Sequence, residues 1–181
     1  MASFIQLVKQ RRSVRAYTDQ PIEQDKLMQC LVAAQLAPSA CNAQPWRFVV
    51  VDNPLLRNKM ADAAVSGVLG MNKFAPQAVV IVAVVMEPAN VTSKLGGLIK
   101  KKDFPLIDVG IAAEHFCLQA AELGIGTCML GWFDEKKVRA LLEIPKNRRI
   151  PLLITMGYPK SEEDREKFRK PIEAISGWNK Y

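Results

Sequence analysis

Three arginines stand within five residues near the start of the chain, in the stretch RRSVRAY that runs from Arg11 to Tyr17. A guanidinium carries a permanent positive charge and a planar set of N–H donors that matches a carboxylate or a phosphate. The stretch also follows the short apolar run FIQLV, and basic residues commonly sit, solvated, at the C-terminal end of a helix. Taken alone, the pattern predicts either an ordinary helix end or a binding site for an anion.

Hydrolytic and phosphate-transfer chemistry is not indicated. The single histidine, His115, lies in the most apolar predicted helix, where we expect a hydrogen-bonded core residue. The sequence has no G-x-S-x-G nucleophile motif and no G-x-x-x-x-G-K phosphate loop. The stretch GIGTCMLG begins like a dinucleotide fingerprint, but Met129 occupies the position of the third glycine and the stretch follows a helix. We therefore interpret Gly124 and Gly126 as a helix stop and a tight turn.

The cysteine content does not point to a metal site. Four cysteines lie far apart, with no C-x-x-C pair, and one histidine cannot complete a zinc site of the usual spacing.

The N-terminus lacks a long apolar stretch with a cleavage site. The longest apolar run, Ala78 to Met86, is too short to span a bilayer as a helix. We expect a cytoplasmic protein with reduced thiols and no metal or membrane partner.

Length and charge indicate one globular domain over residues 1–181. The net charge of +7 requires nucleic acid to be considered as a partner. The positive residues are, however, spread over four short clusters, so a disordered basic arm is not indicated. These clusters are Arg11–Arg15, Lys100–Lys102, Lys146–Arg149 and Lys167–Lys170.

Hydrophobic periodicity and capping residues predict the order of helices and strands. The predicted helices follow Ser3, follow Pro21, span about 54–65 and 106–124, and run from a cap at Asp134 to about Leu142. The predicted strands are 46–51, 78–86, 127–130 and 150–157, and the part VRAYT is also extended. Residues 87–105 are predicted to be irregular. Because strands and helices alternate, the pattern alone favours a parallel sheet with helices on both faces.

Four of these stretches, taken in order, resemble the FMN-dependent nitroreductase family over essentially the whole length. RRSVRAY resembles the family's N-terminal phosphate-binding stretch, and LAPSACNAQPWRFVVV resembles its most recognisable motif. DVGIAAEHFCLQAAELGIGTCMLGWF is similar to the family's central helix and flavin-facing turn, and REKFRKPIEAI to its C-terminal basic stretch. The resemblance implies an α+β fold with a central, mostly antiparallel sheet flanked by helices, in a domain-entwined homodimer.

The resemblance also implies FMN as the cofactor, with binding residues from both ends of the chain. The residues that it places at the FMN phosphate are Arg11, Ser13, Lys167 and Arg169. Arg15 would lie near the flavin pyrimidine edge, where a cation stabilises the anionic reduced flavin. Arg12 would contribute through its backbone or contact the ribityl chain.

Two further segments belong to the implied flavin site. The turn of Met129, Leu130 and Gly131 would bring the Gly131 N–H near flavin N5, and glycine permits that close approach. Some family members carry an acidic residue at the position of Leu130, so this chain departs from them. The partner subunit would supply Pro38, Ser39, Ala40 and Asn42. The aromatic residues expected at the substrate mouth are Phe74, Phe104 and Trp132.

The implied activity is that of an FMN-dependent oxidoreductase. It would pass two electrons from NAD(P)H through flavin N5 to a flat acceptor such as a nitroaromatic, a quinone or an activated alkene. No side chain is expected to act as a catalytic acid or base, because the cofactor carries the reaction. Cys41, Cys128 and His115 are accordingly interpreted as packing residues.

Two alternatives stay open at this point. One is another enzyme of the same superfamily, such as a reductive dehalogenase or a flavin-fragmenting enzyme, which residues 87–105 should distinguish. The other is a non-enzymatic binding module whose basic clusters meet nucleic acid. Aromatic residues make up 7% of the chain and are not interleaved with the basic clusters, which disfavours that module.

Overall fold

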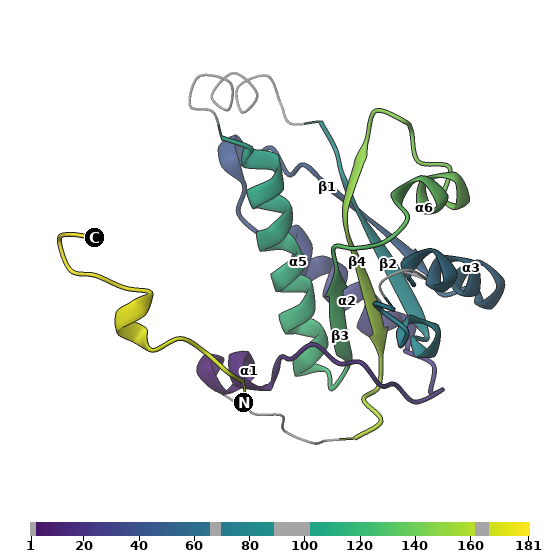
Figure 1. Ribbon diagram of the computed structural model, residues 1–181, viewed down its shortest axis with the longest axis horizontal. Helices are drawn as coiled ribbons and strands as arrows, with labels where there is room; N and C mark the ends of the chain where they lie inside the picture. The colour runs from purple at the N-terminus through teal and green to yellow at the C-terminus, as the bar shows by residue number, and fades with distance from the viewer. Residues whose placement is uncertain (1–2, 66–69, 89–101, 162–166) are drawn as a thin grey trace.

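The computed structural model describes residues 3–65, 70–88, 102–161 and 167–181 (Figure 1). Its centre is a four-stranded sheet in the order β1-β2-β4-β3. The strands are β1 (Trp46–Val51), β2 (Val80–Met86), β3 (Gly126–Leu130) and β4 (Arg149–Gly157). Each neighbouring pair runs antiparallel. The parallel sheet favoured by alternation is therefore wrong, because alternation does not fix strand direction, and the antiparallel sheet implied by the resemblance is confirmed.

Strand β2 is apolar along its whole length because it lies in the middle of the sheet and is covered on both faces. Successive side chains of a strand point to opposite faces. Ile81, Ala83 and Val85 accordingly belong to one buried cluster, whereas Val80 and its alternate neighbours Val82 and Val84 belong to a second. The two clusters make the sheet the middle layer of three.

Helices cover both faces of the sheet, as Figure 1 shows. One face carries α2 (Gln24–Gln35) and the long helix α5 (Phe104–Glu122), and the other carries α3 (Pro54–Ala64) and α6 (Glu135–Leu141). On the α5 side, Phe116 stacks on Phe48 of β1 with ring centroids 5.4 Å apart. In the described part of the chain there are also three short 3₁₀ helices, at Ala40–Asn42, Ala75–Gln77 and Ile172–Ala174. Among the described helices, none is both long and apolar enough to cross a membrane.

The first helix, α1 (Phe4–Gln10), begins where the sequence predicts but does not bury its apolar face. Ser3 caps it, since the Ser3 hydroxyl accepts the Gln6 N–H and the Gln6 side chain accepts the Ser3 N–H. No residue of α1 is buried, and Phe4 is 68% exposed. The predicted apolar face is therefore present but uncovered in a single chain.

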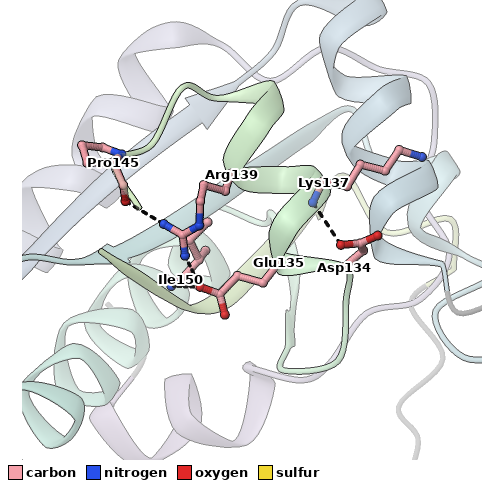
Figure 2. Close-up of polar contacts among 6 residues, drawn as sticks. All are labelled: Asp134, Glu135, Lys137, Arg139, Pro145 and Ile150. Carbon is pink, nitrogen blue, oxygen red and sulfur yellow. Dashed lines mark hydrogen bonds and ion pairs between the residues drawn. The ribbon is translucent and has the colours of Figure 1, made fainter. Parts of the chain in front are cut away.

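Polar contacts fix α6 against the sheet (Figure 2). The predicted cap is confirmed, because the Asp134 carboxylate accepts the Lys137 N–H at 3.0 Å. Glu135 accepts the N–H of Ile150 in β4 at 3.2 Å and forms an ion pair with Arg139. Arg139 also donates to the Pro145 carbonyl at 2.7 Å. These bonds hold the segment that follows β3 in place.

Two regions bear on the predicted substrate mouth and on assembly. Residues 89–101, most of the predicted irregular segment 87–105, lie outside the described residues, and α5 begins at Phe104, two residues earlier than predicted. After residue 167 the chain runs away from the sheet and its helices (Figure 1). This C-terminal segment exposes large apolar side chains, namely Phe168, Ile172, Ile175, Trp178 and Tyr181.

Candidate functional site

The predicted anion-binding stretch, residues 11–17, lies beside β3, at the edge of the sheet. Ser13 forms a parallel bridge with Thr127 of β3, and Tyr17 forms an antiparallel bridge with Pro159. The stretch is therefore extended, as predicted for its VRAYT part. Because it is extended, Arg11, Ser13 and Arg15 fall on one side of it.

Two glycines allow this stretch to lie close against the sheet. A methyl group placed on Gly126 would come within 2.7 Å of Val14, and one on Gly157 within 2.9 Å of Tyr17. Real side chains do not approach so closely, so only glycine fits at both positions. The interpretation of Gly126 as a tight turn is therefore wrong, because Gly126 begins β3. Gly124, with φ of 75°, ends α5 as predicted.

Tyr17 fastens the stretch from inside. Its hydroxyl donates to the Val14 carbonyl at 2.7 Å and lies 2.9 Å from the Thr155 hydroxyl of β4. Burial raises the pKa of the Tyr17 phenol above its ordinary value, and the Thr155 bond opposes that shift. The phenol is therefore neutral at physiological pH, which suits a buried donor with its partners satisfied.

Cys128 of β3 marks the place where three predicted site residues gather. Burial raises the pKa of its thiol, whereas the charge of Arg15, a hydrogen bond with Ser13 and the charge of Arg11 act in the opposite direction. Arg11, Ser13 and Arg15 therefore all lie close enough to influence one buried atom. The thiol is 3% exposed, which confirms that Cys128 is a packed residue.

Arg11 joins the front of the chain to both α5 and the back of the chain. Its Nε lies 3.0 Å from Oε1 of Glu114 on α5. The ammonium of Lys167 donates to the carbonyl oxygens of Val8, at 2.7 Å, and Arg11, at 2.5 Å. The structure thus brings Arg11 and Lys167 together, as the resemblance implies, although Lys167 binds main-chain oxygens at the end of α1.

Arg12 and Arg169 lie differently from the other predicted residues. Nη2 of Arg12 donates to the Ser161 carbonyl at 2.8 Å. Arg12 and Arg11 both line a hollow of about 460 Å³. Ser13, Arg15 and Gly131 do not line that hollow. Arg169 donates to its neighbouring carbonyl, that of Phe168, at 2.8 Å. Among the described residues, Arg169 makes no hydrogen bond to Arg11 or Ser13.

Of the three residues predicted to form the flavin-facing turn, Met129 and Leu130 are the last two residues of β3, and only Gly131 follows the strand. Leu130 is buried in the core, so its side chain does not take up the position of an acidic residue facing a ligand. No atom lies within 4 Å of a methyl group placed on Gly131. Asn72 donates to the carbonyl of Trp132 at 2.8 Å and thereby ties the turn to the segment after α3. The bond from Asn72 therefore fixes this segment, and the space beside Gly131 is open.

The three aromatic residues expected at the substrate mouth differ in their surroundings. The guanidinium of Arg15 lies 5.9 Å from the centre of the half-buried Phe74 ring, within the range of a cation–π contact. Trp132 is 57% exposed, directly after Gly131. Phe104 is half-buried at the start of α5. Phe74 and Trp132 therefore lie near the arginine stretch and the turn, respectively.

The predicted partner-facing loop, residues 38–45, has an unusual backbone. Cys41, Asn42 and Gln44 have φ of 52°, 49° and 45°, a region that residues other than glycine seldom adopt. The Ser39 hydroxyl accepts the Gln44 N–H at 3.0 Å, and both oxygens of Asp108 lie 3.2 Å from the Ala40 nitrogen. A specific set of bonds therefore maintains this loop.

The loop and the arginine stretch lie at different parts of α5. The loop contacts α5 at Asp108, near its start, and the stretch contacts it at Glu114, near its middle. Within one chain, no described hydrogen bond joins the two. Cys41 in the loop is exposed, so its interpretation as a packed cysteine is wrong for a single chain.

His115 makes the expected hydrogen bond but is not the core residue that the sequence predicts. Its Nδ1 lies 3.3 Å from the Ala33 carbonyl of α2. The side chain is half-buried rather than deep in the core, and it lines an apolar groove together with Phe4 and Leu36. A hydrogen-bonded histidine between two helices needs no catalytic role.

Sequence reasoning missed three residues that hold the candidate site together. Asp108, Glu114 and Asn72 fix the loop, Arg11 and the turn, respectively. For Asp108 a signal existed, because a carboxylate within the apolar run LIDVGIAA must find a partner if it is buried. For Asn72 the sequence offered none, because the Trp132 carbonyl that it binds lies 60 positions away.

Comparisons with known proteins identify the family of this chain. The sequence profile of the nitroreductase family matches residues 8–158. A putative NADH dehydrogenase/NAD(P)H nitroreductase of Archaeoglobus fulgidus is 34% identical, over 91% of this chain and 90% of that protein. The structure of an FMN-dependent nitroreductase from Clostridium difficile R20291 has a TM-score of 0.78 at 26% identity, over 98% of this chain and 100% of the other. A nitroreductase family protein from Clostridium difficile 630 has a TM-score of 0.80 at 27% identity, covering 99% and 100%. The chain therefore belongs to the nitroreductase family.

Proposed function

We propose that this chain is an FMN-dependent oxidoreductase that takes electrons from NAD(P)H and passes them in pairs to a flat acceptor. Nitroaromatics, quinones and activated alkenes form the proposed acceptor class. The observation that carries the proposal is the placement of the arginine stretch against β3, where Ser13 pairs with Thr127 and Glu114 of α5 holds Arg11, in a chain of this family. Two relatives, a putative NADH dehydrogenase/NAD(P)H nitroreductase and an FMN-dependent nitroreductase, support the nicotinamide and the flavin.

The residues present fit the phosphate end of FMN. The ion pair with Glu114 occupies Nε of Arg11, and a guanidinium has two further nitrogens that donate to a phosphate. The Ser13 hydroxyl is a second donor on the same side. Lys167 adds positive charge beside Arg11. We propose that these three residues hold the phosphate, with Arg169 joining them in the assembled protein.

The turn after β3 fits a flat ring. Open space lies beside Gly131 where any other residue would place a side chain, and such a cradle suits the close approach of a backbone N–H to a ligand. Asn72 fixes the neighbouring Trp132 carbonyl. We propose that Met129, Leu130 and Gly131 face the flavin through their backbone, since Leu130 itself is buried.

Bound FMN would supply the chemistry, as a two-electron carrier between the two substrates. The chain would bind and orient it. Arg15, whose guanidinium lies over Phe74, would place a fixed positive charge where negative charge gathers on reduction, and such a charge needs no reorganisation during the reaction. Tyr17 and Cys128 lie near the stretch, but both are buried and their pKa values are raised. The proposal therefore assigns no proton transfer to either of these residues.

We further propose that the active form is a homodimer in which Pro38, Ser39, Ala40 and Asn42 of one chain complete the site of the other. The separation of this loop from the arginine stretch within one chain supports that assignment. The uncovered apolar face of α1 and the apolar C-terminal segment supply surface that a second copy would bury. Sedimentation should then show a dimer with two flavins, and a flavin-loaded monomer would contradict the proposed assembly.

Steady-state kinetics with purified protein, added FMN, NADH or NADPH, and menadione as a quinone test the proposed reaction. Both substrates should use one mouth in turn, so reciprocal plots at several quinone concentrations should give parallel lines. Anaerobic addition of the nicotinamide alone should bleach the flavin absorbance, and later addition of the quinone should restore it. Intersecting lines, or no bleaching by either nicotinamide, would contradict the proposed function.

A further inference from the structure

Asp108 of α5 has a buried carboxylate whose hydrogen-bond partner lies outside that helix. It is 4% exposed, within the most apolar stretch of α5. Its two oxygens, Oδ1 and Oδ2, each lie 3.2 Å from the backbone nitrogen of Ala40. Because burial of a carboxylate is costly unless it is hydrogen-bonded, the Ala40 N–H is a principal partner that makes this position tolerable.

The loop that donates this hydrogen bond has a backbone conformation that needs support from outside the loop. Three of its residues, Cys41, Asn42 and Gln44, have positive φ, and such conformations persist only where the surroundings enforce them. The local closure is the bond from the Gln44 N–H to the Ser39 hydroxyl, at 3.0 Å. Asp108 supplies the anchor from the body of the protein.

We propose that Asp108 is a positioning residue for the flavin site, acting through the Ala40 N–H. By holding Ala40 it sets the place of the neighbouring Ser39 and of Asn42, the residues assigned above to the flavin of the partner subunit. The inference rests on the proposed function. It adds that the affinity for FMN depends on a carboxylate that does not itself contact the flavin.

Three variants separate positioning from general stability. Asp108→Ala removes the acceptor, and Asp108→Asn keeps one acceptor oxygen but loses the second oxygen and the charge. Val109→Ala is the matched control, because Val109 is 1% exposed, adjacent on α5, and packs in the core without a polar bond to the loop. Each full-length variant is examined by hydrogen exchange of the peptide covering 38–45, by FMN titration of the cofactor-free protein, and by thermal unfolding.

We expect Asp108→Ala to speed exchange in 38–45 and to weaken FMN binding, each by roughly tenfold or more, as for loss of a hydrogen bond to a charged group. Asp108→Asn should change both in the same direction by less. Since the carboxamide fills the vacated volume, it also serves if Asp108→Ala does not fold. Val109→Ala should lower the unfolding temperature without changing either quantity.

The outcomes distinguish this inference from the proposed function. Exchange and FMN affinity that stay at the wild-type values in both Asp108 variants would overturn the positioning role. Faster exchange with unchanged FMN affinity would also overturn it, because the loop would then be anchored without serving the cofactor. A wild-type protein that binds no FMN, with faster loop exchange in Asp108→Ala, would contradict the proposed function itself and leave Asp108 as a loop anchor only.

Discussion

Glu114 holds Arg11 by an ion pair in which Oε1 and Nε lie 3.0 Å apart, and thereby fixes the arginine stretch to the long helix α5. Arg11 is only about one-fifth exposed in this pair. A solvated helix end would leave its guanidinium in water. The pairing therefore favours the second of the two interpretations of RRSVRAY, a positioned cation, and it leads to a first prediction.

Arg11→Ala should weaken FMN binding by about 1.5–3 kcal/mol, the usual effect of losing a hydrogen bond to a charged group. Arg149→Ala is the control, because Arg149 is exposed and lies at the opposite end of β4 from Gly157. Flavin fluorescence titration of the two variants and the wild type measures the affinity for FMN. Higher salt should reduce the difference in affinity between Arg11→Ala and the wild type only partly. Equal affinities in all three proteins would return Arg11 to the status of an ordinary helix end.

Gly126→Ala should destabilise the protein by about 1–3 kcal/mol, the range seen for overpacking. The added methyl group would meet Val14 at 2.7 Å, and the stretch that carries the arginines would have to move away. Urea unfolding measures the stability. The double variant Gly126→Ala/Val14→Ala removes the clash. Its loss of stability should therefore be smaller than the sum of the losses in the two single variants. Strict additivity would show that Gly126 and Val14 do not contact each other as described.

Glu23 should contribute a pH-dependent part of the stability. Hydrogen bonds, led by the one from the Tyr158 hydroxyl, lower the pKa of Glu23 to about 2. Since the folded-state pKa lies below the unfolded value, the stabilisation is present above about pH 4.5 and is lost as the pH falls towards 2. Wild type should therefore be more stable than Glu23→Gln at pH 7, with the difference disappearing at acid pH.

Tyr158→Phe removes the donor and should reproduce most of this behaviour, although Lys26 still contacts Glu23. The unfolding temperature measured from pH 7 down to pH 2 provides the comparison. A difference between wild type and Glu23→Gln that stays constant over this range would mean that the bond seen in the structure does not affect the titration of Glu23.

Thiol chemistry should find one accessible cysteine. All four cysteines are described, none forms a disulfide, and Cys41 is exposed whereas the others are buried. Burial also raises the pKa of Cys30 and of Cys117 to about 12, so these two are protonated at pH 8. A chromogenic disulfide reagent should therefore modify one thiol per native chain quickly, and none in Cys41→Ser. Any fast thiol in Cys41→Ser would contradict the described core.

The rate of Cys41 modification also tests whether the loop lies near FMN. If the loop of one chain faces the flavin of the other, added FMN should slow the modification of Cys41. The buried thiols should react only after denaturation, with or without FMN.

Much of the fold could be predicted from the sequence, because its patterns are local. Ser3 and Asp134 cap helices where expected, and the run ending at Met86 is a doubly buried strand. Strand direction could not be predicted from alternation, because it depends on which edges meet. The resemblance supplied it. The exposure of Phe4 could not be predicted either, since an apolar helix face does not reveal whether its partner belongs to the same chain.

The candidate site could be predicted in part. The extended arginine stretch and the turn before Trp132 followed from short motifs. The residues that hold them, Asp108 and Glu114, act through contacts across 68 and more than 100 positions of sequence. No pattern in a single sequence reports such contacts. The roles of the individual residues towards FMN stay predictions, and the variants above test them.

The visible absorption spectrum of the purified protein tests the central claim most directly. The account predicts a yellow protein, or a colourless one that becomes yellow on addition of FMN, with one flavin per chain. Heating should release FMN and not FAD, because the site described here has donors for a terminal phosphate and no dinucleotide fingerprint for an adenosine half. A protein that is colourless and fails to take up added FMN would contradict the account.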